Sequence, residues 1–588
     1  MANQSTAPNV PGSPDPIRPE AMVAWYNPSQ LVQTALEVVL STIFGRHADR
    51  RLIEGLDIEG KRIYDYTKNE DETNRETIWI DYVADVGDGW DSTYAVAYWL
   101  AQPRLTLRAP DGGEVETQRG HLIVFGGDEV YPTAGRDDYE RRLVAPYKAA
   151  LGWTDPPNPH AFAIAGNHDW YDSLAAFIRL FCTEQWFGGW KTRQSRSYFA
   201  LKLPHGWWLL GTDVQLESDI DRAQVQYFQW VADQMEPGDR IILCNAEPHW
   251  IYAGMYGTRD PDYSENNLKY LEEKVLRRHV SVFLAGDLHH YRRHAAKDGT
   301  QKITAGGGGA FLHPTHGPDV SKLVEKGRHG RPKLFELQAS FPACEISRRL
   351  AWRNVLFPWL NPWFGVLPAM LYLLTSWVVM ADIGGFGLHQ FPAALYATLH
   401  AVAGGPAGVF WALVIFGGFL LFTDTHISSY RRIAGPLHGF AHVAATFLIA
   451  WSAAYLAKTI LCLPFKSLGH LGVAAVVILI GGYLVGSVIM GMYLLISLNA
   501  FGRHSNEAFS SLHIPDWKNF LRLRIDVDGT LSILPVGIRR VPRKWKPSPH
   551  TSGPRMLPDD TAGTVPELIE QPISVMHRRR AVADTESP

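Results

Sequence analysis

Short runs of apolar residues recur along the first 350 residues of the chain, and each run ends in a polar loop. Five of them are LIVFGG, FAIAG, WWLLGTD, RIILCNA and VSVFLAG. Continuous apolar runs of this length are typical of buried strands, and stretches with helical periodicity separate most of them. The pattern predicts a mixed α/β domain whose active site lies at the edge of a sheet, among loops rich in Gly, Asp, Asn and His.

Beyond residue 355 the apolar runs become long enough to cross a lipid bilayer. Four of them, near 361–382, 403–423, 438–463 and 470–498, predict an all-α transmembrane domain of about four helices. The stretch FPAALYATLHAVAGGP before the second run is either an interfacial helix or a fifth span. The spans contain almost no charged residues, which favours an anchor over a transport pathway. Glycines in GGYLVGSVIMG suggest a homodimer formed through the membrane helices.

Basic residues flank the predicted spans unevenly. They are Arg348, Arg349 and Arg353 before the first span, Arg431 and Arg432 between the second and third, and Arg503 after the fourth. Lys458 and Lys466 follow the third span, which weakens this pattern without reversing it. The positive-inside rule then predicts a multi-pass protein of the cell (inner) membrane, with the N-terminal domain and the C-terminus in the cytoplasm. A fifth span would move the C-terminus to the other side.

These patterns divide the chain into seven expected segments. They are a disordered arm (1–22), a helical extension (23–77), the α/β domain (78–320), a linker (321–354), the transmembrane domain (355–498), a small cytoplasmic β-element (499–546) and a disordered tail (547–588). Within the extension, a helix is expected from about Ser29 to Phe44. The β-element is inferred from FLRLRIDVDGTLSILPVGI, which alternates around an Asp-Gly turn.

Composition and charge narrow the functional classes. The formal net charge is −3 and charged residues make up 20% of the chain, which gives no sign of a nucleic-acid partner. The four cysteines, Cys182, Cys244, Cys344 and Cys462, have no paired spacing. This argues against a disulfide framework or a zinc ribbon and favours a reducing compartment. Twenty tryptophans are a common feature of chains that meet a membrane interface.

Four strand-end loops carry the chemistry of a metal site. They are ADVGDGW with Asp85, GGDEVY with Asp128 and Tyr131, GNHDWYD with Asn167 and His168, and GDLHHYRR with Asp287 and His289. Oxygen and imidazole ligands from separate strand ends can converge on hard or borderline metal ions. Two cations that share a bridging carboxylate could clamp a phosphoryl group and lower the pKa of a bound water. Each loop alone has an ordinary structural explanation, so it is their order and their strand-end positions that favour a metal site.

This series of motifs resembles the calcineurin-like metallophosphoesterases, and within them the purple acid phosphatases. The motifs are Asp-x-Gly, Gly-Asp-x-x-Tyr, Gly-Asn-His-Asp and Gly-x-x-His-x-Tyr, and the resemblance covers roughly residues 78–315. Most of the superfamily begins with Asp-x-His, whereas the purple acid phosphatases have glycine there and supply a tyrosine from the second motif. Gly87 and Tyr131 show both halves of this exchange. The resemblance implies a β-sandwich flanked by helices and a site for two metal ions.

The resemblance also implies a role for each matched residue. Asp85, Asp128, Tyr131 and His289 would bind the first metal, and Asp128 would bridge to the second metal, which Asn167 would also bind. His168 would lie outside the metal ligands and would contact the phosphoryl oxygens or protonate the leaving group. The nucleophile would be a metal-bound hydroxide that attacks phosphorus. The implied activity is that of a phosphoester hydrolase.

Two positions depart from the family pattern. Where the family has a histidine followed by x-Pro, this chain has Ala246, with Glu247 and His249 on either side of Pro248. We favour Glu247 as a metal ligand because it lies closer to the expected strand end, with His249, or neither residue, as the alternatives. Asp287 stands where the last motif usually has its first histidine. Carboxylates in place of imidazoles favour iron, manganese or magnesium over zinc.

Candidate substrate contacts follow the last motif. Arg292 or Arg293 would bind a phosphate through paired hydrogen bonds, or would hold the loop through a salt bridge. His313 and His316 follow four consecutive glycines and would line the cleft or belong to a structural turn. The expected substrate is a phosphorylated small molecule, with a pyrophosphate or a lipid-linked phosphate at the bilayer surface as the alternative. A non-catalytic scaffold or sensor that kept the fold is a third interpretation.

Overall fold

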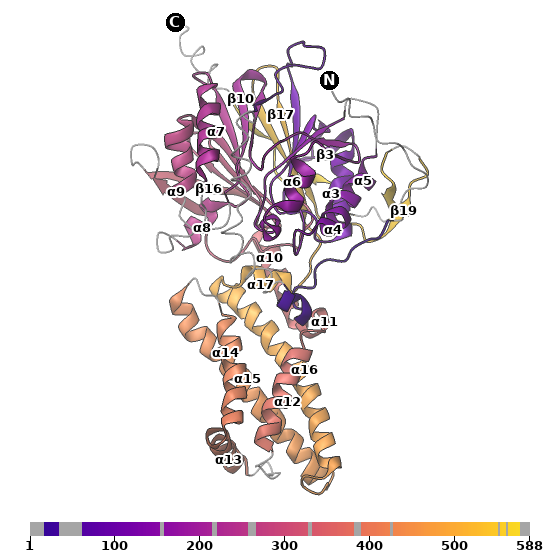
Figure 1. The fold of residues 1–588 in the computed structure, drawn as a ribbon, viewed down its shortest axis with the longest axis vertical. Helices are drawn as coiled ribbons and strands as arrows, with labels where there is room; N and C mark the ends of the chain where they lie inside the picture. The colour runs from indigo at the N-terminus through magenta and orange to yellow at the C-terminus, as the bar shows by residue number, and fades with distance from the viewer. Residues whose placement is uncertain are drawn as a thin grey trace.

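The computed structural model describes residues 17–33, 62–152, 158–214, 220–256, 266–326, 332–380, 390–423, 427–550, 553–559 and 563–576. In this part of the chain a two-sheet α/β domain stands on a bundle of long helices (Figure 1). Most of the helix predicted over 29–44 lies outside the described residues, as do residues 1–16 of the predicted arm and 577–588 of the predicted tail.

Two large sheets form the α/β domain. The described strands of the first sheet are, in pairing order, β1 (Tyr64–Asp65), β9 (Phe199–Leu203), β10 (Trp207–Gly211), β11 (Arg240–Cys244), β12 (His279–Ala285), β14 (Gln301–Ala305), β13 (Tyr291–Ala296), β16 (Pro332–Phe341) and β15 (Lys322–Lys326). Those of the second are β4 (Glu114–Gln118), β3 (Arg104–Arg108), β21 (Glu567–Leu568), β18 (Leu531–Ile538), β17 (Lys518–Ile525), β2 (Ile78–Val83), β5 (Leu122–Phe125), β6 (His160–Ala163), β8 (Trp190–Thr192) and β7 (Trp186–Phe187), with β22 (Ile573–Val575) paired to β18. β19 (Trp545–Pro547) and β20 (Met556–Pro558) form a separate pair.

Apolar side chains from both sheets form a shared core between them. Its fully buried members include Val124, Phe162, Ile242, Leu284 and Ile533. Burying such side chains stabilises the sandwich by about 25 cal/mol per Å² of apolar surface. The five apolar runs noted in the sequence form β5, β6, β10, β11 and β12, which confirms the mixed α/β class.

Helices cover the outer faces of the sandwich. α3 (Trp90–Ala101), α5 (Ala145–Ala150) and α6 (Ala175–Phe181) pack on the second sheet, and α7 (Arg222–Asp233), α8 (His249–Tyr256) and η7 (Leu271–Leu276) pack on the first. Shorter helical segments are α4 (Arg136–Asp138), η2 (Tyr139–Val144), η3 (Asp169–Asp172), η4 (Pro204–Gly206) and α9 (Asn266–Tyr270).

The C-terminal strands complete the second sheet, instead of forming the separate β-element predicted over 499–546. β17 pairs antiparallel with β2, and β18 pairs with the other edge of β17. Arg522 of β17 and Asp81 of β2 form a buried ion pair at 3.1 Å. Because the partners are 441 residues apart, local alternation could predict the strands but not their place in the sheet.

Two further segments differ from the predicted domain boundaries. β15 and β16 extend the first sheet, so this part of the predicted linker over 321–354 belongs to the α/β domain. β20, β21 and β22 give regular structure to part of the predicted disordered tail. β21 and β22 pair with the distant β18, so composition alone could not reveal them, whereas β20 pairs with the nearby β19.

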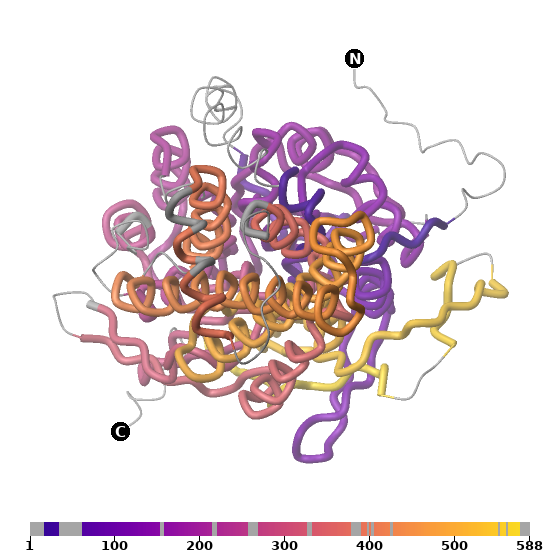
Figure 2. The backbone as a smooth tube through the Cα atoms, turned by 90° about the horizontal axis from the view of Figure 1, so that it is seen from below, coloured from indigo at the N-terminus to yellow at the C-terminus, as the bar shows by residue number. Residues whose placement is uncertain are grey.

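The helical region lies below the α/β domain (Figures 1 and 2). Its helices are α12 (Val366–Met380), α13 (Phe391–Gly404), α14 (Pro406–Leu421), α15 (Ser428–Tyr455) with its continuation η11 (Leu456–Ile460), and α16 (Leu468–Phe501). Two helices, Ser428–Ile460 and Leu468–Phe501, are long and apolar enough to cross a membrane, judged by length and composition. Val366–Trp377 and Pro406–Leu421 are apolar but shorter. Two of the four predicted spans therefore reach this length within the described residues.

Short helices join the two regions (Figure 1). They are α10 (Cys344–Ala351), η9 (Trp352–Leu356), α11 (Phe357–Leu360) and α17 (Ser505–Ser510). Asn354 of η9 donates to the carbonyl of Ala508 in α17 at 3.0 Å, so these segments are bonded to each other.

The glycines of α16 pack within the chain. A Cβ on Gly482 would lie 2.8 Å from the Cα of Ala369, and one on Gly486 would lie 2.5 Å from the Cβ of Pro368. Close packing of α16 against α12 thus accounts for glycines that suggested a dimer contact in the sequence.

Candidate metal centre

Strands of both sheets end at the same place. In the second sheet β2, β5 and β6 run parallel, and they are followed by Asp85, Asp128 and Asn167. In the first sheet β11 and β12 run parallel, and they are followed by Glu247 and Asp287. Because parallel strands end on one edge of a sheet, the topology gathers these polar side chains where the two edges meet.

Unusual backbone conformations turn three of the carboxylates at these strand ends. Asp85, Asp128 and Asp287 have φ values of 58°, 53° and 65°, in the left-handed region that costs a non-glycine residue about 1–2 kcal/mol. Gly87 has a φ of 64°, and a Cβ there would lie 2.1 Å from the carbonyl oxygen of Glu129. The first motif therefore has no room for a side chain at this position. Strain of this kind is typical of functional sites.

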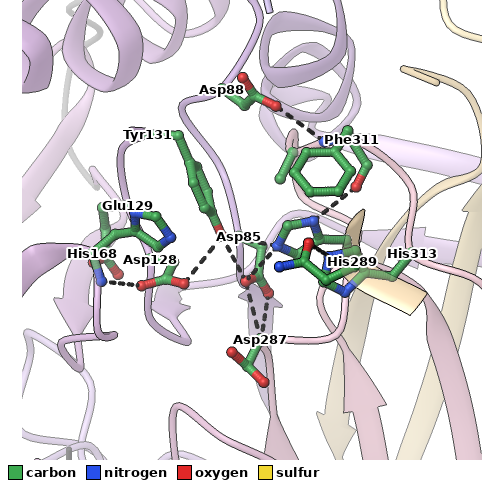
Figure 3. A network of polar contacts seen from close by, with 12 residues as sticks. Asp85, Asp88, Asp128, Glu129, Tyr131, His168, Asp287, His289, Phe311 and His313 are labelled. Atoms are coloured by element: carbon green, nitrogen blue, oxygen red, sulfur yellow. Dashed lines mark hydrogen bonds and ion pairs between the residues drawn. The ribbon is translucent and has the colours of Figure 1, made fainter. Parts of the chain in front are cut away.

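The hydroxyl of Tyr131 lies at the centre of the cluster (Figure 3). It is 2.9 Å from Asp85 Oδ1, 3.1 Å from Asp128 Oδ2 and 3.0 Å from His289 Nε2. His289 Nδ1 lies 2.8 Å from the carbonyl oxygen of Phe311, which holds the ring proton on Nδ1 and leaves Nε2 as an acceptor. The single hydroxyl proton of Tyr131 can satisfy only one of three acceptors at a time. A cation among them would satisfy the others, so this donor set fits a metal ion.

Asn167 and His168 contact the other side of Asp128. The side-chain amide of Asn167 faces both carboxylate oxygens of Asp128, at 3.1 and 3.3 Å. With its nitrogen toward Asp128 the amide donates, and with its oxygen toward Asp128 it offers a ligand to a cation between them. The backbone N–H of His168 donates to Asp128 Oδ1 at 2.9 Å, and His168 Nδ1 lies 2.8 Å from the carbonyl of Pro132. His168 Nε2 is thereby left for other chemistry.

Asp287 is bonded to the cluster through its backbone. Its N–H donates to both carboxylate oxygens of Asp85, at 3.1 and 2.9 Å, and its own side chain accepts from the hydroxyl of Tyr252. The carboxyl group of Asp287 is therefore held by a tyrosine that the sequence did not single out.

Near the end of β11, Glu247 is partly buried and His249 is buried, and the carboxylate of Glu247 lies 3.8 Å from His249 Nε2. The pKa of Glu247 is raised to about 8 by burial and then by the negative charges of Asp287 and Asp128. His249 Nδ1 lies 3.0 Å from the carbonyl oxygen of Glu247. Its pKa is lowered to about 4 by burial, with a smaller contribution from Lys302. The electrostatic coupling to the carboxylate cluster thus belongs to Glu247.

The cluster contains more buried negative charge than its own residues neutralise. The pKa of Asp85 is raised well above its ordinary value by burial and then by Asp128 and Asp287. Burial and Asp169 raise the pKa of Asp128 to about 8, and burial raises that of Asp287 to about 6. A cation bound among carboxylates lowers such raised pKa values, so this excess of buried carboxyl groups is a second observation that fits a metal site. No three His, Cys, Asp or Glu side chains of the described residues form a metal-binding group alone, so the donor set depends on Tyr131 and Asn167 as well.

The two arginines of the last motif hold other parts of the fold. Arg292 is buried, and its Nη2 donates to the carbonyl of Thr315 at 2.9 Å. Arg293 forms an ion pair at 2.5 Å with Glu570, which lies between β21 and β22. The sequence left open whether these arginines bind phosphate or hold the fold. The structure provides contacts for the second role.

The two histidines after the glycine run lie in different places. His313 stacks on His289, with ring centroids 3.8 Å apart, and its Nε2 lies 3.1 Å from Asn506 Oδ1 of α17. His316 lies 2.7 Å from Ser347 Oγ in α10 and 2.8 Å from Asn499 Oδ1 in α16. His313 therefore borders the cluster, and His316 belongs to the junction with the helices.

Two residues far from the motifs also reach the centre. The ring of Trp25 lies edge-on to Tyr131 and His168, with centroids 6.4 and 6.0 Å away. Lys518, at the start of β17, donates to the carbonyl of Ala310, and burial lowers its pKa to about 8. No local pattern marks either residue, because the N-terminal segment and β17 come to the site only through tertiary contacts.

Residues 78–291 match the family model described as calcineurin-like phosphoesterase. A search of curated proteins found no match to the chain.

Solved structures with partial similarity include GAP50, the anchor in the inner membrane complex of Plasmodium. It is 12% identical, with a TM-score of 0.30, and the alignment covers 45% of this chain and 84% of that one. The purple acid phosphatase PPD1 from yellow lupin seeds is 12% identical, with a TM-score of 0.29 and coverage of 46% and 49%. PhoD is 12% identical, with a TM-score of 0.25 and coverage of 41% and 58%. This chain thus spans about half the length of PPD1 and PhoD, and similarity at this level does not indicate function.

Proposed function

We propose that the chain is a metal-dependent phosphoester hydrolase with two metal ions at the cluster described above. The observation that carries the proposal is the Tyr131 hydroxyl, which lies within 3.1 Å of three acceptors and has one proton to give. The match of residues 78–291 to the calcineurin-like phosphoesterases supports the same chemistry. When bound, two cations would act as Lewis acids on the phosphoryl oxygens and would lower the pKa of a bound water.

The residues of the cluster divide between the two ions. Asp85, Asp128, Tyr131 and His289 would hold the first, and Asp128, Asn167, Glu247 and Asp287 would hold the second. Glu247 is preferred to His249 because its carboxyl group is coupled to Asp287 and Asp128. Three carboxylates and an amide oxygen make an oxygen-rich second site, which favours iron, manganese or magnesium over zinc.

His168 is the proposed proton-handling residue. The carbonyl of Pro132 holds its Nδ1 proton, so Nε2 is the atom that exchanges a proton with the substrate or its leaving group. Burial lowers the pKa of His168, which keeps the ring neutral before substrate binds. A phosphate anion beside Nε2 would raise this pKa again and favour proton donation. His313, stacked on His289 and bonded to Asn506, is proposed to position His289 rather than to contact substrate.

We also propose that the helical region anchors the enzyme in the membrane through four spans, α12, α14, α15 and α16. β2 lies before the helical region and β17 lies after it, yet the two strands pair. Both ends of the region must then be on the same side of the membrane, which requires an even number of crossings. This supports α13 as a non-spanning helix. The arginines at the ends of the spans support a cytoplasmic α/β domain as part of this proposal.

Replacing the proposed bridging ligand tests the metal-dependent activity. Asp128→Asn should lower the hydrolysis of p-nitrophenyl phosphate, assayed with manganese, by about 100-fold or more, because an amide does not bridge two cations. Metal analysis should show fewer ions per chain than in the parent protein. Asp111→Asn, in the exposed turn between β3 and β4, is the matched control and should change neither quantity. Full turnover and full metal content in Asp128→Asn would contradict the proposal.

A further inference from the structure

The segment that joins the α/β domain to the bundle presents tryptophans to its surroundings. Trp352, Trp359 and Trp363 are 61%, 71% and 65% exposed. Other side chains of the same segment are buried, with Asn354 bonded to Ala508 and Phe357 packed in the core of the helical region. Three exposed tryptophans within residues 352–363 are more exposed apolar surface than a segment in water normally keeps.

Arginines accompany these tryptophans. Arg348, Arg349 and Arg353 are exposed, and none of them has an ion-pair partner among the residues that the structure describes. Tryptophan rings together with unpaired cations suit the headgroup level of a bilayer, where the rings sit between water and hydrocarbon and the cations meet lipid phosphates. The segment is also continuous with α12 and packs on α16, so it lies where those helices would enter the membrane.

The metal centre is bonded to this segment through one loop. Ser347 Oγ of α10 accepts from the backbone N–H of Thr315 at 3.0 Å and lies 2.7 Å from His316 Nδ1. Four residues earlier in the loop, the carbonyl of Phe311 holds the Nδ1 proton of His289. Between them, Leu312 packs in the core of the helical region. The loop that orients a proposed metal ligand is thus attached to the membrane-level segment.

Trp25 and Tyr26, here called the N-terminal strap, make a second connection between the metal centre and this segment. The ring of Trp25 contacts Tyr131 and His168 at the metal centre. The ring of the next residue, Tyr26, packs against Phe357 of α11, with centroids 5.0 Å apart. Two consecutive residues of this strap therefore contact the centre and the helix that carries Trp359.

From these contacts we propose that the exposed face of residues 348–363 lies on the anionic surface of the bilayer, and that the substrate is a phosphate carried by a membrane lipid. The inference rests on the proposed hydrolase activity and names the substrate class of the same site. The arginines match the charge of lipid phosphates, and the connected loop and strap keep the metal centre beside the headgroups. A lipid phosphate then reaches the centre by diffusion within the leaflet.

The test compares lipid phosphates with their own soluble headgroups, using the full chain in nanodiscs. Phosphatidic acid is paired with glycerol 3-phosphate, and phosphatidylglycerol with glycerophosphoglycerol, so that both a monoester and a diester are covered. p-Nitrophenyl phosphate and bis(p-nitrophenyl) phosphate report the activity of the metal centre itself. At least one lipid should be cleaved with a kcat/KM about tenfold or more above that of its headgroup.

A triple variant, Arg348→Gln with Arg349→Gln and Arg353→Gln, should reduce this preference and leave aryl phosphate turnover unchanged. The matched control replaces three exposed arginines of the α/β domain, Arg104, Arg108 and Arg179, by glutamine and should keep the preference. Hydroxyl-radical labelling gives a readout independent of activity, because Trp359 and Trp363 should be protected in nanodiscs while Tyr270, 49% exposed on the α/β domain, is labelled.

The outcomes separate the two proposals. If aryl phosphates are cleaved but neither lipid exceeds its headgroup, or if the tryptophans are labelled as readily as Tyr270, the lipid inference is wrong and the hydrolase stands. If no phosphoester is cleaved with manganese, iron or magnesium supplied, the hydrolase proposal fails and the lipid inference fails with it.

Discussion

The side chains of the candidate centre are held in conformations that favour a bound cation. Asp85, Asp128 and Asp287 all adopt left-handed backbone, and Tyr131 contacts two of them together with His289. In the metal-free protein this crowding is relieved by proton uptake, as the raised pKa values of the carboxyl groups show. Metal ions and protons therefore compete for the same oxygens.

We expect the metal-free protein to lose stability as the pH rises from 7 to 8. The pKa values of Asp128 and Glu247 are about 8 in the folded protein, against about 4 in an unfolded chain. In this window the folded state binds more protons than the unfolded state, so the free energy of unfolding falls with rising pH. Buried histidines of the α/β domain such as His249 and His313 are neutral in the folded protein but about one-quarter protonated at pH 7 in the unfolded chain, so each offsets a small part of this loss. The lowered pKa of Lys518 acts mainly above about 8. Thermal unfolding of chelator-treated protein should show a lower Tm at pH 8 than at pH 7.

Added manganese should remove most of this pH dependence, because the carboxylates then stay ionised in the folded state. In the metal-free protein, Asp128→Asn should weaken the pH dependence of the Tm. A metal-free Tm that is constant or rises between pH 7 and 8 would show that the carboxyl groups are not crowded as described.

The second sheet is assembled from elements at opposite ends of the chain. β2 supplies Asp85 at its end, and its neighbours are β5 on one side and β17 on the other. Asp81 of β2 and Arg522 of β17 bury their ion pair in the sheet, and Arg522 also donates to Thr117 Oγ1 at 2.9 Å. A fragment that ended near residue 350 would lack β17 and β18 and would expose the strand that leads to the first metal ligand.

Arg522→Met should destabilise the α/β domain by about 3–5 kcal/mol, because it leaves the buried carboxylate of Asp81 without its partner. Chemical denaturation of the full chain in detergent measures the effect. The double variant Asp81→Leu with Arg522→Met removes both charges and should recover part of the loss. Arg104→Met, on exposed β3, is the control. If Arg522→Met shifted the midpoint no more than this control, the pair would not hold β17 in place.

The pairing of β2 with β17 also constrains the whole molecule. The chain leaves the α/β domain after β16 of the first sheet, passes through the helical region and returns as β17 of the second sheet (Figure 1). An odd number of membrane crossings would separate β2 from β17 by a bilayer. The four spans proposed above would keep the two strands on the same side of the membrane.

Native cysteines allow this topology to be measured. Cys462 is exposed between η11 and α16, at the opposite end of the bundle from the α/β domain, whereas Cys182 and Cys344 belong to the α/β side. A membrane-impermeant maleimide applied to intact cells should label Cys462 and leave Cys182 and Cys344 unlabelled until the membrane is permeabilised.

Cys462→Ser should abolish the labelling of intact cells. Labelling of Cys344 from outside, with Cys462 protected, would reverse the proposed orientation. Labelling of both residues, or of neither, before permeabilisation would exclude the three crossings, α12, α14 and α15, that the proposal puts between them.

The sequence by itself determined the α/β class, the five apolar strands and the helices of the C-terminal region, because these depend on local periodicity and length. It also predicted the strand-end residues Asp85, Asp128, Asn167 and Asp287, since parallel strands bring their ends together in any such sheet. The structure leaves no room for a side chain at Gly87, and the hydroxyl of Tyr131 lies at the centre of the cluster. Both observations agree with the glycine and the tyrosine that were noted together in the motifs.

Only the tertiary structure decided which distant segments complete the domain and the centre. β17 and β18 join β2 through backbone hydrogen bonds, and any partner strand of suitable register could have made such bonds. Trp25 and Lys518 reach the cluster, and Arg292 and Arg293 turn to Thr315 and Glu570, because of packing that no short pattern encodes. Local periodicity determines which elements form, whereas long-range packing determines which of them become neighbours.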